Sequence, residues 1–212
     1  MTFDNKFQNH TEVMEALNTG KMSVEEAEMW LVRKQRVTDC TQCNLCHTST
    51  QRVFGVGNPK AYVLIVGEAP SKDDDVMGLP FMDRSGNFLR KLMHEAGFRK
   101  GDVYLTNIIR CKTPERREPT KDEVGACFMH FWDQLEIIKP RLIIPLGSVA
   151  LKAICSNSKR TIGGLRRDDL SAHGYHVIPT WHPNFVLGQH SALREKELLK
   201  DLKKAYKAVF SG

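Results

Sequence analysis

Four short apolar runs, with helix-like segments between them, constrain the fold of this chain most strongly. They are AYVLIVG from Ala61, VYLTNII from Val103, RLIIPLG from Arg141 and YHVIPTW from Tyr175. Continuous apolar runs of this length suit strands that are buried on both faces, and such strands alternate with helices in parallel sheets. The chain is therefore expected to fold as an α/β protein with a mainly parallel sheet.

The segments between and after these runs have the periodicity of helices. Helices are expected at residues 85–96, 120–138, 148–154 and 193–210. Thr120 and Glu123 have the spacing of a capping box, in which each side chain bonds a backbone N–H that the helix end leaves unpaired. The start of the second of these helices is therefore predicted most sharply.

The first forty residues predict two short helices, at residues 11–17 and 23–36. Ser23 begins the second helix, because Ser23 and Glu26 again have capping-box spacing. Four apolar side chains then recur at helical spacing and are expected to face the core: Val24, Ala27, Trp30 and Leu31. We expect residues 1–38 to be a helical extension and residues 39–212 to be one domain.

Composition excludes some classes of protein and favours others. The 212 residues suit a single α/β domain, and the net charge of +6 with a pI near 9.0 favours a polyanionic partner, although many basic proteins bind none. No apolar stretch is long enough to span a bilayer, and the first ten residues are polar. We therefore expect a cytoplasmic protein without a membrane anchor or secretory signal.

Cysteines are grouped as in a metal centre. Disulfides rarely persist in a reducing cytosol, where a Cys-x-x-Cys pair more often binds metal or does redox chemistry. Cys40 and Cys43 lie in a turn-rich segment, Cys111 follows a strand-like run, and Cys127 lies within a helical pattern. Four-cysteine zinc sites usually have two close pairs, whereas the second pair is split here, which favours an iron-sulfur cluster and leaves zinc as the alternative.

Two further cysteines affect this interpretation differently. Cys43 and Cys46 also have Cys-x-x-Cys spacing, so Cys46 is an equally good partner by spacing. Cys155 lies far from the others in the chain and is expected to be a buried or half-buried free thiol.

Polar or small residues follow the end of each apolar run. Glu68, Asn107, Gly147 and His182 lie at or just after the ends of the four runs in turn. In open α/β sheets, ligands bind beyond the carboxyl ends of the parallel strands. These residues are therefore expected to converge on one binding site.

Taken together, these segments resemble the family 4 uracil-DNA glycosylases, the iron-sulfur branch of the uracil-DNA glycosylase superfamily. The resemblance covers roughly residues 39–187 and includes CTQC, RVFGVGNP, VLIVGEAP, GLPFMDRSG, YLTNIIRC, LIIPLG and TWHP, in the family's order. It implies a three-layer αβα fold with a central, mainly parallel four-stranded sheet. It also implies a 4Fe-4S cluster on the four cysteines, and hydrolysis of the N-glycosidic bond of uracil flipped out of DNA, which leaves an abasic site.

The resemblance implies roles for five residues in gripping the base. Gly67 and Ala69 would let the backbone approach the base closely, and Phe81 would stack on its face. Asn107 would read the O4 and N3–H edge of uracil and reject the opposite pattern on cytosine. His182 would donate a hydrogen bond to uracil O2, where negative charge builds as the bond breaks.

The resemblance also assigns two carboxylates to the chemistry at the sugar. Asp74 would stabilise the positive charge that develops on the sugar and position the attacking water. Glu68 would line the pocket or help to hold that water. With His182, these two residues form the expected catalytic set.

Each of these residues also has a purely structural interpretation. Residues 73–75 suit a solvated turn, Glu68 a cap and Phe81 a core position under a loop. Asn107 suits a turn that satisfies its own backbone, and His182 suits a structural histidine. The functional interpretation is favoured only because all these residues occur together, in the family's order, in a chain that also carries the four cysteines.

Binding to DNA requires basic groups near the pocket, since phosphate contacts supply most of the non-specific affinity. The candidates are Arg84, Arg166, Arg167, His190 and Arg194. The segment HPNFVLGQH from His182 resembles the family's inserting loop, in which Phe185 or Leu187 would fill the gap left by the flipped base. The expected partner is uracil-containing DNA, single- or double-stranded, bound by a monomer.

Two other functions remain open from the sequence. The chain suits a non-catalytic DNA-binding protein that keeps the same fold and cluster. It also suits a hydrolase of another nucleoside or nucleotide, stabilised by zinc. An iron-sulfur protein is brown and a zinc protein is colourless, so colour distinguishes the last alternative.

Overall fold

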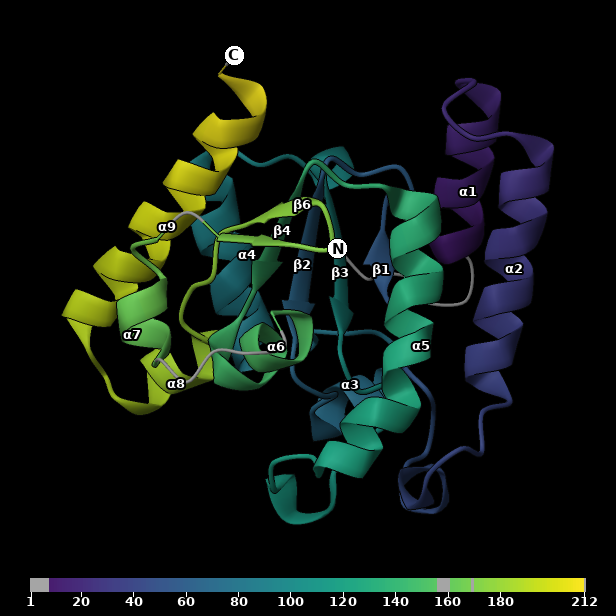
Figure 1. Cartoon of the computed structure of the whole chain (residues 1–212), viewed down its shortest axis with the longest axis horizontal. Helices are drawn as coiled ribbons and strands as arrows, with labels where there is room; N and C mark the ends of the chain where they lie inside the picture. The colour runs from purple at the N-terminus through teal and green to yellow at the C-terminus, as the bar shows by residue number, and fades with distance from the viewer. Residues whose placement is uncertain (1–7, 156–160, 169, 212) are drawn as a thin grey trace.

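The sheet at the centre of the molecule contains the four predicted strands (Figure 1). The computed structural model describes residues 8–155, 161–168 and 170–211. Its parallel strands are β2 (Val63–Gly67), β3 (Val103–Asn107), β4 (Leu142–Pro145) and β6 (Tyr175–Val177). The expected α/β class with a mainly parallel sheet is therefore confirmed.

Two short antiparallel strands extend the sheet at its edges. β1 (Val56–Gly57) pairs with β3, and β5 (Leu170–Ala172) pairs with β6, which gives the order β1-β3-β2-β4-β6-β5. The sheet therefore has six strands, of which the expected four form the centre. Segments of two and three residues carry too little alternation to be recognised as strands in a sequence.

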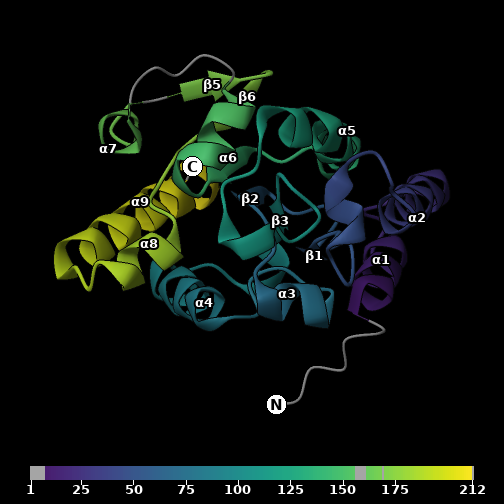
Figure 2. The same ribbon diagram turned by 90° about the horizontal axis from the view of Figure 1, so that it is seen from below.

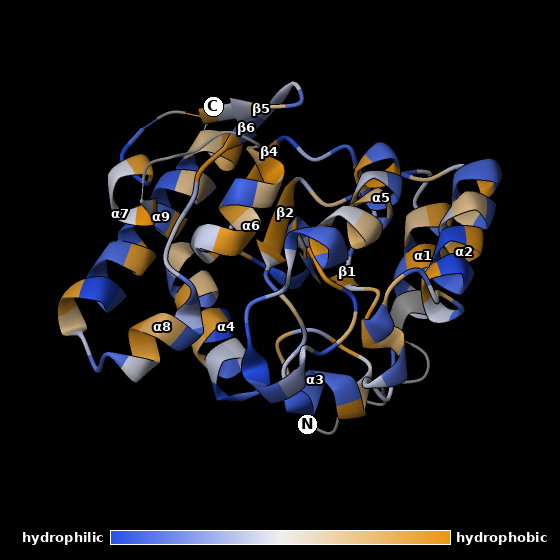
Figure 3. Ribbon diagram, turned by 60° about the horizontal axis from the view of Figure 1, so that its bottom comes forward, coloured by the Kyte–Doolittle hydropathy of each residue, from blue (hydrophilic) through white to orange (hydrophobic). Residues whose placement is uncertain are grey.

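Helices cover both faces of the sheet, so the fold has three layers (Figure 2). Along β2, Val63 and Ile65 belong to the apolar cluster on one face of the sheet, whereas Leu64 and Val66 belong to the apolar cluster on the other face. Because successive side chains of a strand point to opposite faces, a strand covered on both faces must be apolar throughout. Figure 3 shows this apolar centre between helices with polar outer surfaces.

The four helices predicted between and after the strands are confirmed to within one residue at their ends. The capping boxes at Ser23 and Glu26 and at Thr120 and Glu123 are both formed. The helices are α1 (Gln8–Asn18), α2 (Val24–Thr38), α3 (Lys72–Met77), α4 (Arg84–Ala96), α5 (Lys121–Ile138), α6 (Gly147–Ile154), α7 (Ile162–Leu165), α8 (Pro183–Gly188) and α9 (Ala192–Phe210), with 3-10 turns at Asn44–His47, Lys100–Asp102 and Pro114–Arg116.

Helix α2 is anchored to the sheet by one aromatic side chain. Trp30 is buried and packs edge-on against Phe54 and Tyr104, with ring centroids 5.1 and 5.3 Å apart. Ala27 is also buried, as predicted, but the prediction was wrong for Val24 and Leu31, which are exposed. At about 100° per residue, both lie about 100–120° around the helix from Trp30, outside its narrow buried stripe.

No helix within the described ranges is long and apolar enough to cross a membrane. The polar segment 1–7, on which the expectation of no secretory signal partly rests, lies outside the described residues.

We predict that Trp30→Ala lowers the free energy of unfolding by about 3–5 kcal/mol, because it removes a large buried ring and leaves a cavity. Val32→Ala is the matched control, since Val32 lies on the same helix and is 61% exposed. It should change stability by less than about 0.5 kcal/mol. Urea denaturation followed by circular dichroism measures both. Equal effects of the two substitutions would show that α2 is not anchored through Trp30.

Candidate active site and cysteine cavity

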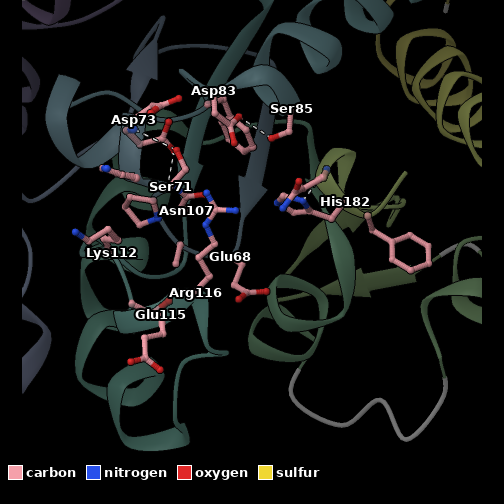
Figure 4. Close-up of a pocket in the computed structure, with 18 residues that line it drawn as sticks. Glu68, Ser71, Asp73, Asp83, Ser85, Asn107, Lys112, Glu115, Arg116 and His182 are labelled. Atoms are coloured by element: carbon pink, nitrogen blue, oxygen red, sulfur yellow. Dashed lines mark hydrogen bonds between the residues drawn. The ribbon is translucent and has the colours of Figure 1, made fainter. Parts of the chain in front are cut away.

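A cavity of about 580 Å³ opens beyond the carboxyl ends of the parallel strands (Figure 4). The parallel register places Gly67 of β2 opposite Asn107 of β3, and His182 follows β6 at the start of α8. Six of the seven predicted catalytic and base-binding residues line the cavity: Glu68, Ala69, Asp74, Phe81, Asn107 and His182. Of the four residues expected to converge, Glu68, Asn107 and His182 line this cavity, whereas Gly147 does not line it and instead packs close to His182, where a Cβ atom would lie 3.1 Å from His182 Cβ.

Asn107 forms the polar edge of the cavity. It is 3% exposed, and its Nδ2 atom has no hydrogen-bond partner among the described residues. A buried amide donor without a partner costs roughly 1–3 kcal/mol, so its retention indicates a ligand that accepts the hydrogen bond. Gly67 leaves this edge open, because a Cβ atom there would overlap Asn107 Oδ1 and lie 2.8 Å from Phe81 Cζ.

Phe81 holds its ring in the cavity through an unusual backbone conformation. Its φ is 59°, in the left-handed region that non-glycine residues rarely adopt. Two contacts fix it there: Arg90 Nη1 donates to the Phe81 carbonyl at 2.7 Å, and Gly86 packs so closely on that carbonyl that a Cβ atom would overlap it. The ring is therefore positioned before any ligand arrives.

Asp74 is a fixed, buried carboxylate, and the alternative of a solvated turn is wrong for it. It lies in α3, where Ser71 and Asp74 form a further capping box. Its Oδ2 accepts from the Ser71 N–H at 3.1 Å and its Oδ1 accepts from the Met82 N–H at 2.6 Å. Burial raises the pKa of Asp74, and these hydrogen bonds oppose the increase. The Phe81 N–H and the Ser71 hydroxyl also hydrogen-bond this carboxylate, so the fold fixes its position.

Glu68 and His182 lie on other sides of the same cavity (Figure 4). The pKa of Glu68 is raised, mainly by burial and further by the negative charge of Glu118. Burial lowers the pKa of His182 to about 4, so its ring is neutral at pH 7. His182 Nδ1 accepts from the Asn184 N–H at 3.2 Å, which leaves the ring proton on Nε2.

Two basic residues at the mouth of the cavity were missed in the sequence analysis. Lys112 and Arg116 line it from the loop after Cys111. The backbone of Arg116 has a φ of 58°, in the left-handed region, so the loop is irregular at this residue. The basic residues in the segment CKTPERREP, which begins at Cys111, are the sequence signal that could have identified them.

The candidate phosphate contacts divide into two groups. Arg84, Arg167 and His190 are exposed, as phosphate binding requires. Arg166 was predicted wrongly, because it is buried and engaged by the carboxylates of Asp201 and Glu197. A guanidinium already paired at 2.8 Å with a buried aspartate is not available to DNA.

The segment after β6 presents an exposed aromatic side chain. Phe185 is 44% exposed and stacks on Trp181 at 5.5 Å, whereas Leu187 is half-buried. The guanidinium of Arg194 also lies over the Trp181 ring, 4.4 Å from its centroid, and pairs with Glu197 at 2.7 Å. Of the two candidates for insertion into DNA, Phe185 is therefore the more accessible.

A separate, very small cavity of about 10 Å³ is lined mainly by cysteines. The cysteines come from the segment after α2, the end of β3 and helix α5, and they are Cys40, Cys43, Cys46, Cys111 and Cys127. Cys155 is half-buried and does not line this cavity. In the described part of the chain, no three His, Cys, Asp or Glu side chains are arranged so as to hold a metal ion.

Donors and a buried cation surround these sulfurs. The Arg110 N–H donates to Cys127 Sγ at 3.3 Å, and His130 Nε2 lies 3.2 Å from Cys40 Sγ. The Arg110 side chain is 1% exposed, and its guanidinium bonds the Phe54 carbonyl, Thr106 Oγ1 and Gln134 Oε1, all neutral acceptors. A buried cation needs a counter-charge, which thiolates beside it would supply.

Asp75 connects the cysteine segment to the larger cavity. Its Oδ1 accepts from the N–H groups of Thr50 and Gln51 at 2.8 and 3.2 Å, and its Oδ2 pairs with Lys112 at 3.2 Å. Burial alone would raise the pKa of Asp75, but the hydrogen bonds outweigh it and the pKa is lowered. The loop after Cys46 is thus tied to α3, which carries Asp74.

Comparison with known proteins identifies the class to which this fold and site belong. A family model described as the uracil DNA glycosylase superfamily matches residues 54–205. The type-4 uracil-DNA glycosylase of Thermotoga maritima is 36% identical over 179 residues, which cover 84% of this chain and 93% of that protein.

Two archaeal proteins are similarly close. The type-4 uracil-DNA glycosylase of Archaeoglobus fulgidus is 35% identical, over 80% of this chain and 88% of that protein. The type-4 enzyme of Pyrobaculum aerophilum is 35% identical, over 83% and 90%. The chain therefore belongs to the uracil-DNA glycosylase superfamily and, within it, to the type-4 family.

We predict that Asp75→Asn lowers the free energy of unfolding at pH 7 by about 1–3 kcal/mol, because charge-assisted hydrogen bonds and the Lys112 pair are lost. The folded pKa of Asp75 lies below the unfolded value of about 3.9, so its contribution is complete above that value and is lost as the pH falls through the folded pKa. The difference from wild type should be constant down to about pH 5 and shrink below about pH 4.

Urea titrations at several pH values measure this difference. Asp73→Asn is the control, since Asp73 is the exposed neighbour on the same helix, and it should leave stability unchanged. A wild-type advantage that persists unchanged at low pH would contradict an ionised Asp75.

Proposed function

We propose that the larger cavity binds uracil flipped out of DNA and that the chain hydrolyses its N-glycosidic bond, leaving an abasic site. The chain belongs to the uracil-DNA glycosylase superfamily, and a cavity of about 580 Å³ is large enough for a base. The observation that carries the proposal is the buried Nδ2 donor of Asn107, which has no partner in the described part of the chain and lies beside the Phe81 ring.

Recognition of uracil follows from the Asn107 amide. Nδ2 donates to uracil O4, and Oδ1 accepts from N3–H. Cytosine presents a donor at the first position and an acceptor at the second, so it would leave both groups of the amide unsatisfied. Phe81 stacks on the ring, while Gly67 and Ala69 allow the backbone to approach the base.

Departure of the base is assisted by His182. The anion that forms carries charge on O2, and the neutral ring directs its Nε2–H donor at that atom. The hydrogen bond strengthens as the charge develops, so it stabilises the transition state more than the ground state. The Asn184 N–H, which bonds Nδ1, keeps the ring in this tautomer.

Two carboxylates act at the sugar. Asp74, held by the backbone of Ser71 and Met82, positions the water and favours positive charge at C1′. Glu68 helps to hold the same water. Its raised pKa makes it a stronger base for the proton that the water releases.

Uracil-containing DNA, single- or double-stranded, is the proposed partner of a cytoplasmic monomer. Arg116, an exposed residue of the cavity lining, and the exposed Arg84, Arg167 and His190 contact phosphates. The exposed Phe185 fills the gap that the flipped base leaves.

We propose that Cys40, Cys43, Cys111 and Cys127, which all line the cysteine cavity, bind a 4Fe-4S cluster. Sulfurs from three separate segments surround one cavity, with an N–H donor on Cys127 and the buried charge of Arg110 beside them. When bound, the cluster cross-links these segments, and no step of the hydrolysis passes through it. We further propose that residues 1–38 are a helical extension of the glycosylase domain, 39–212.

We predict that Asn107→Ala and His182→Ala each slow uracil release by about 10²-fold or more, because each removes a donor aimed at the reacting base. The measurement is single-turnover cleavage of a labelled uracil-containing oligonucleotide after alkali treatment. His94→Ala, an exposed histidine on α4 outside the cavity, should match wild type. An inactive wild type that still binds the oligonucleotide would favour the non-catalytic DNA-binding protein instead.

We predict that the purified protein is brown and contains iron and sulfide, and that Cys127→Ser loses both. Cys155→Ser should keep them, since Cys155 lies outside the cavity. Iron and sulfide analysis with visible absorption measures this. A colourless wild type loaded with zinc would contradict the cluster and favour the zinc alternative.

A further inference from the structure

The cysteine cavity contains one sulfur more than a four-ligand cluster uses. Five cysteines line it, and the fifth, Cys46, is buried at 6% exposure. Cys46 lies in the 3-10 turn Asn44–His47, for which Cys43 is the N-cap residue. The additional thiol therefore belongs to the same short turn as a proposed ligand.

Local geometry brings Cys43 and Cys46 to the same cavity. The Cys46 N–H donates to the Cys43 carbonyl at 3.2 Å, which closes the turn between them. Cys43 precedes the turn in an extended conformation and Cys46 lies within it, yet both residues line the cavity. Either sulfur is therefore placed to serve as the ligand at this corner.

The proposed ligands are not held equally. His130 Nε2 lies beside Cys40 Sγ, the Ser49 hydroxyl hydrogen-bonds Cys111, and the Arg110 N–H donates to Cys127 Sγ. For Cys43 Sγ, no hydrogen bond is formed within the described ranges. Cys43 is therefore the ligand that the protein fixes least, and it is the one with a neighbour of equal spacing.

The charges around the cavity also suit an exchangeable sulfur. Arg52 and Arg110 both line it, and the Nε atom of each is buried without a partner among the described residues. Two buried donors that await acceptors stabilise a thiolate in either position. Cys155, outside the cavity, has no such surroundings.

We propose that Cys43 and Cys46 are interchangeable ligands at one corner of the metal centre, which rests on the cluster proposed above. In the exchange, the Cys46 thiol gives up its proton as its sulfur binds iron, and Cys43 takes up a proton as its bond to iron breaks. No electron is transferred. Cys40, held by His130, is not replaced.

The test compares Cys43→Ser, Cys46→Ser and the double variant, with Cys40→Ser as the matched control, all purified as the full chain without oxygen. Iron and sulfide per chain and the electron paramagnetic resonance spectrum of the reduced protein are measured. We expect Cys46→Ser to match wild type. Cys43→Ser should keep its iron with a shifted spectrum, and the double variant and Cys40→Ser should lose most of theirs.

Loss of iron from Cys43→Ser as complete as in the double variant would overturn the exchange, provided that circular dichroism shows a folded chain. If that variant fails to fold, alkylation of the iron-loaded wild type followed by peptide mass spectrometry decides. Labelling divided between Cys43 and Cys46 supports exchange, and labelling of Cys46 alone overturns it. A wild type without iron would instead overturn the proposed cluster.

Discussion

The buried guanidinium of Arg110 is the interaction on which the two cavities depend. It bonds the Phe54 carbonyl, Thr106 on β3 and Gln134 on α5, while its own backbone N–H donates to Cys127. Gln134 in turn donates to the Phe54 carbonyl and to the Tyr104 hydroxyl. Burying a cation among neutral acceptors costs several kcal/mol, so the arrangement is stable only where a negative charge lies close by. Cluster thiolates would provide that charge, so metal binding and packing of the β3 face are coupled.

The cysteine cavity and the base pocket are linked through the peptide bond between Thr106 and Asn107. Thr106, which Arg110 holds, precedes Asn107, whose amide faces the larger cavity. Electrostatic catalysis requires donors that are fixed before the charge develops, because reorientation during the reaction would consume the gain. The pocket residues meet this requirement. Asn107 is fixed by its place in β3, Phe81 by the hydrogen bond from Arg90 to its carbonyl, and Asp74 by the hydrogen bond from the Met82 N–H. A bound cluster would therefore support catalysis by rigidity rather than by chemistry.

Much of this arrangement was predictable from the sequence, because it rests on local patterns. Strand runs, capping boxes and the residues that follow strand ends are each visible in a few consecutive letters, and the parallel sheet then brings Glu68, Asn107 and His182 together. The predictions that failed concern features that depend on contacts between distant segments. Arg166 looked like a phosphate contact until the fold paired it with Asp201, 35 residues further along the chain. The edge strands β1 and β5 exist only because neighbouring strands supply their partners.

Contacts between distant segments also change the interpretation of the positive net charge. The net charge of +6 favoured a polyanionic partner, but several cations are engaged in ion pairs within the chain: Arg33 and Arg36 with Asp133, Arg117 with Glu123, and Arg166 with Asp201. The pairs at Asp133 hold α2 on α5, and the Arg166 pair holds the end of α7 on α9, so they serve the fold. Affinity for DNA must then come from the few cations at the rim of the base pocket. Such a short positive rim favours an enzyme that samples and releases DNA over one that coats it.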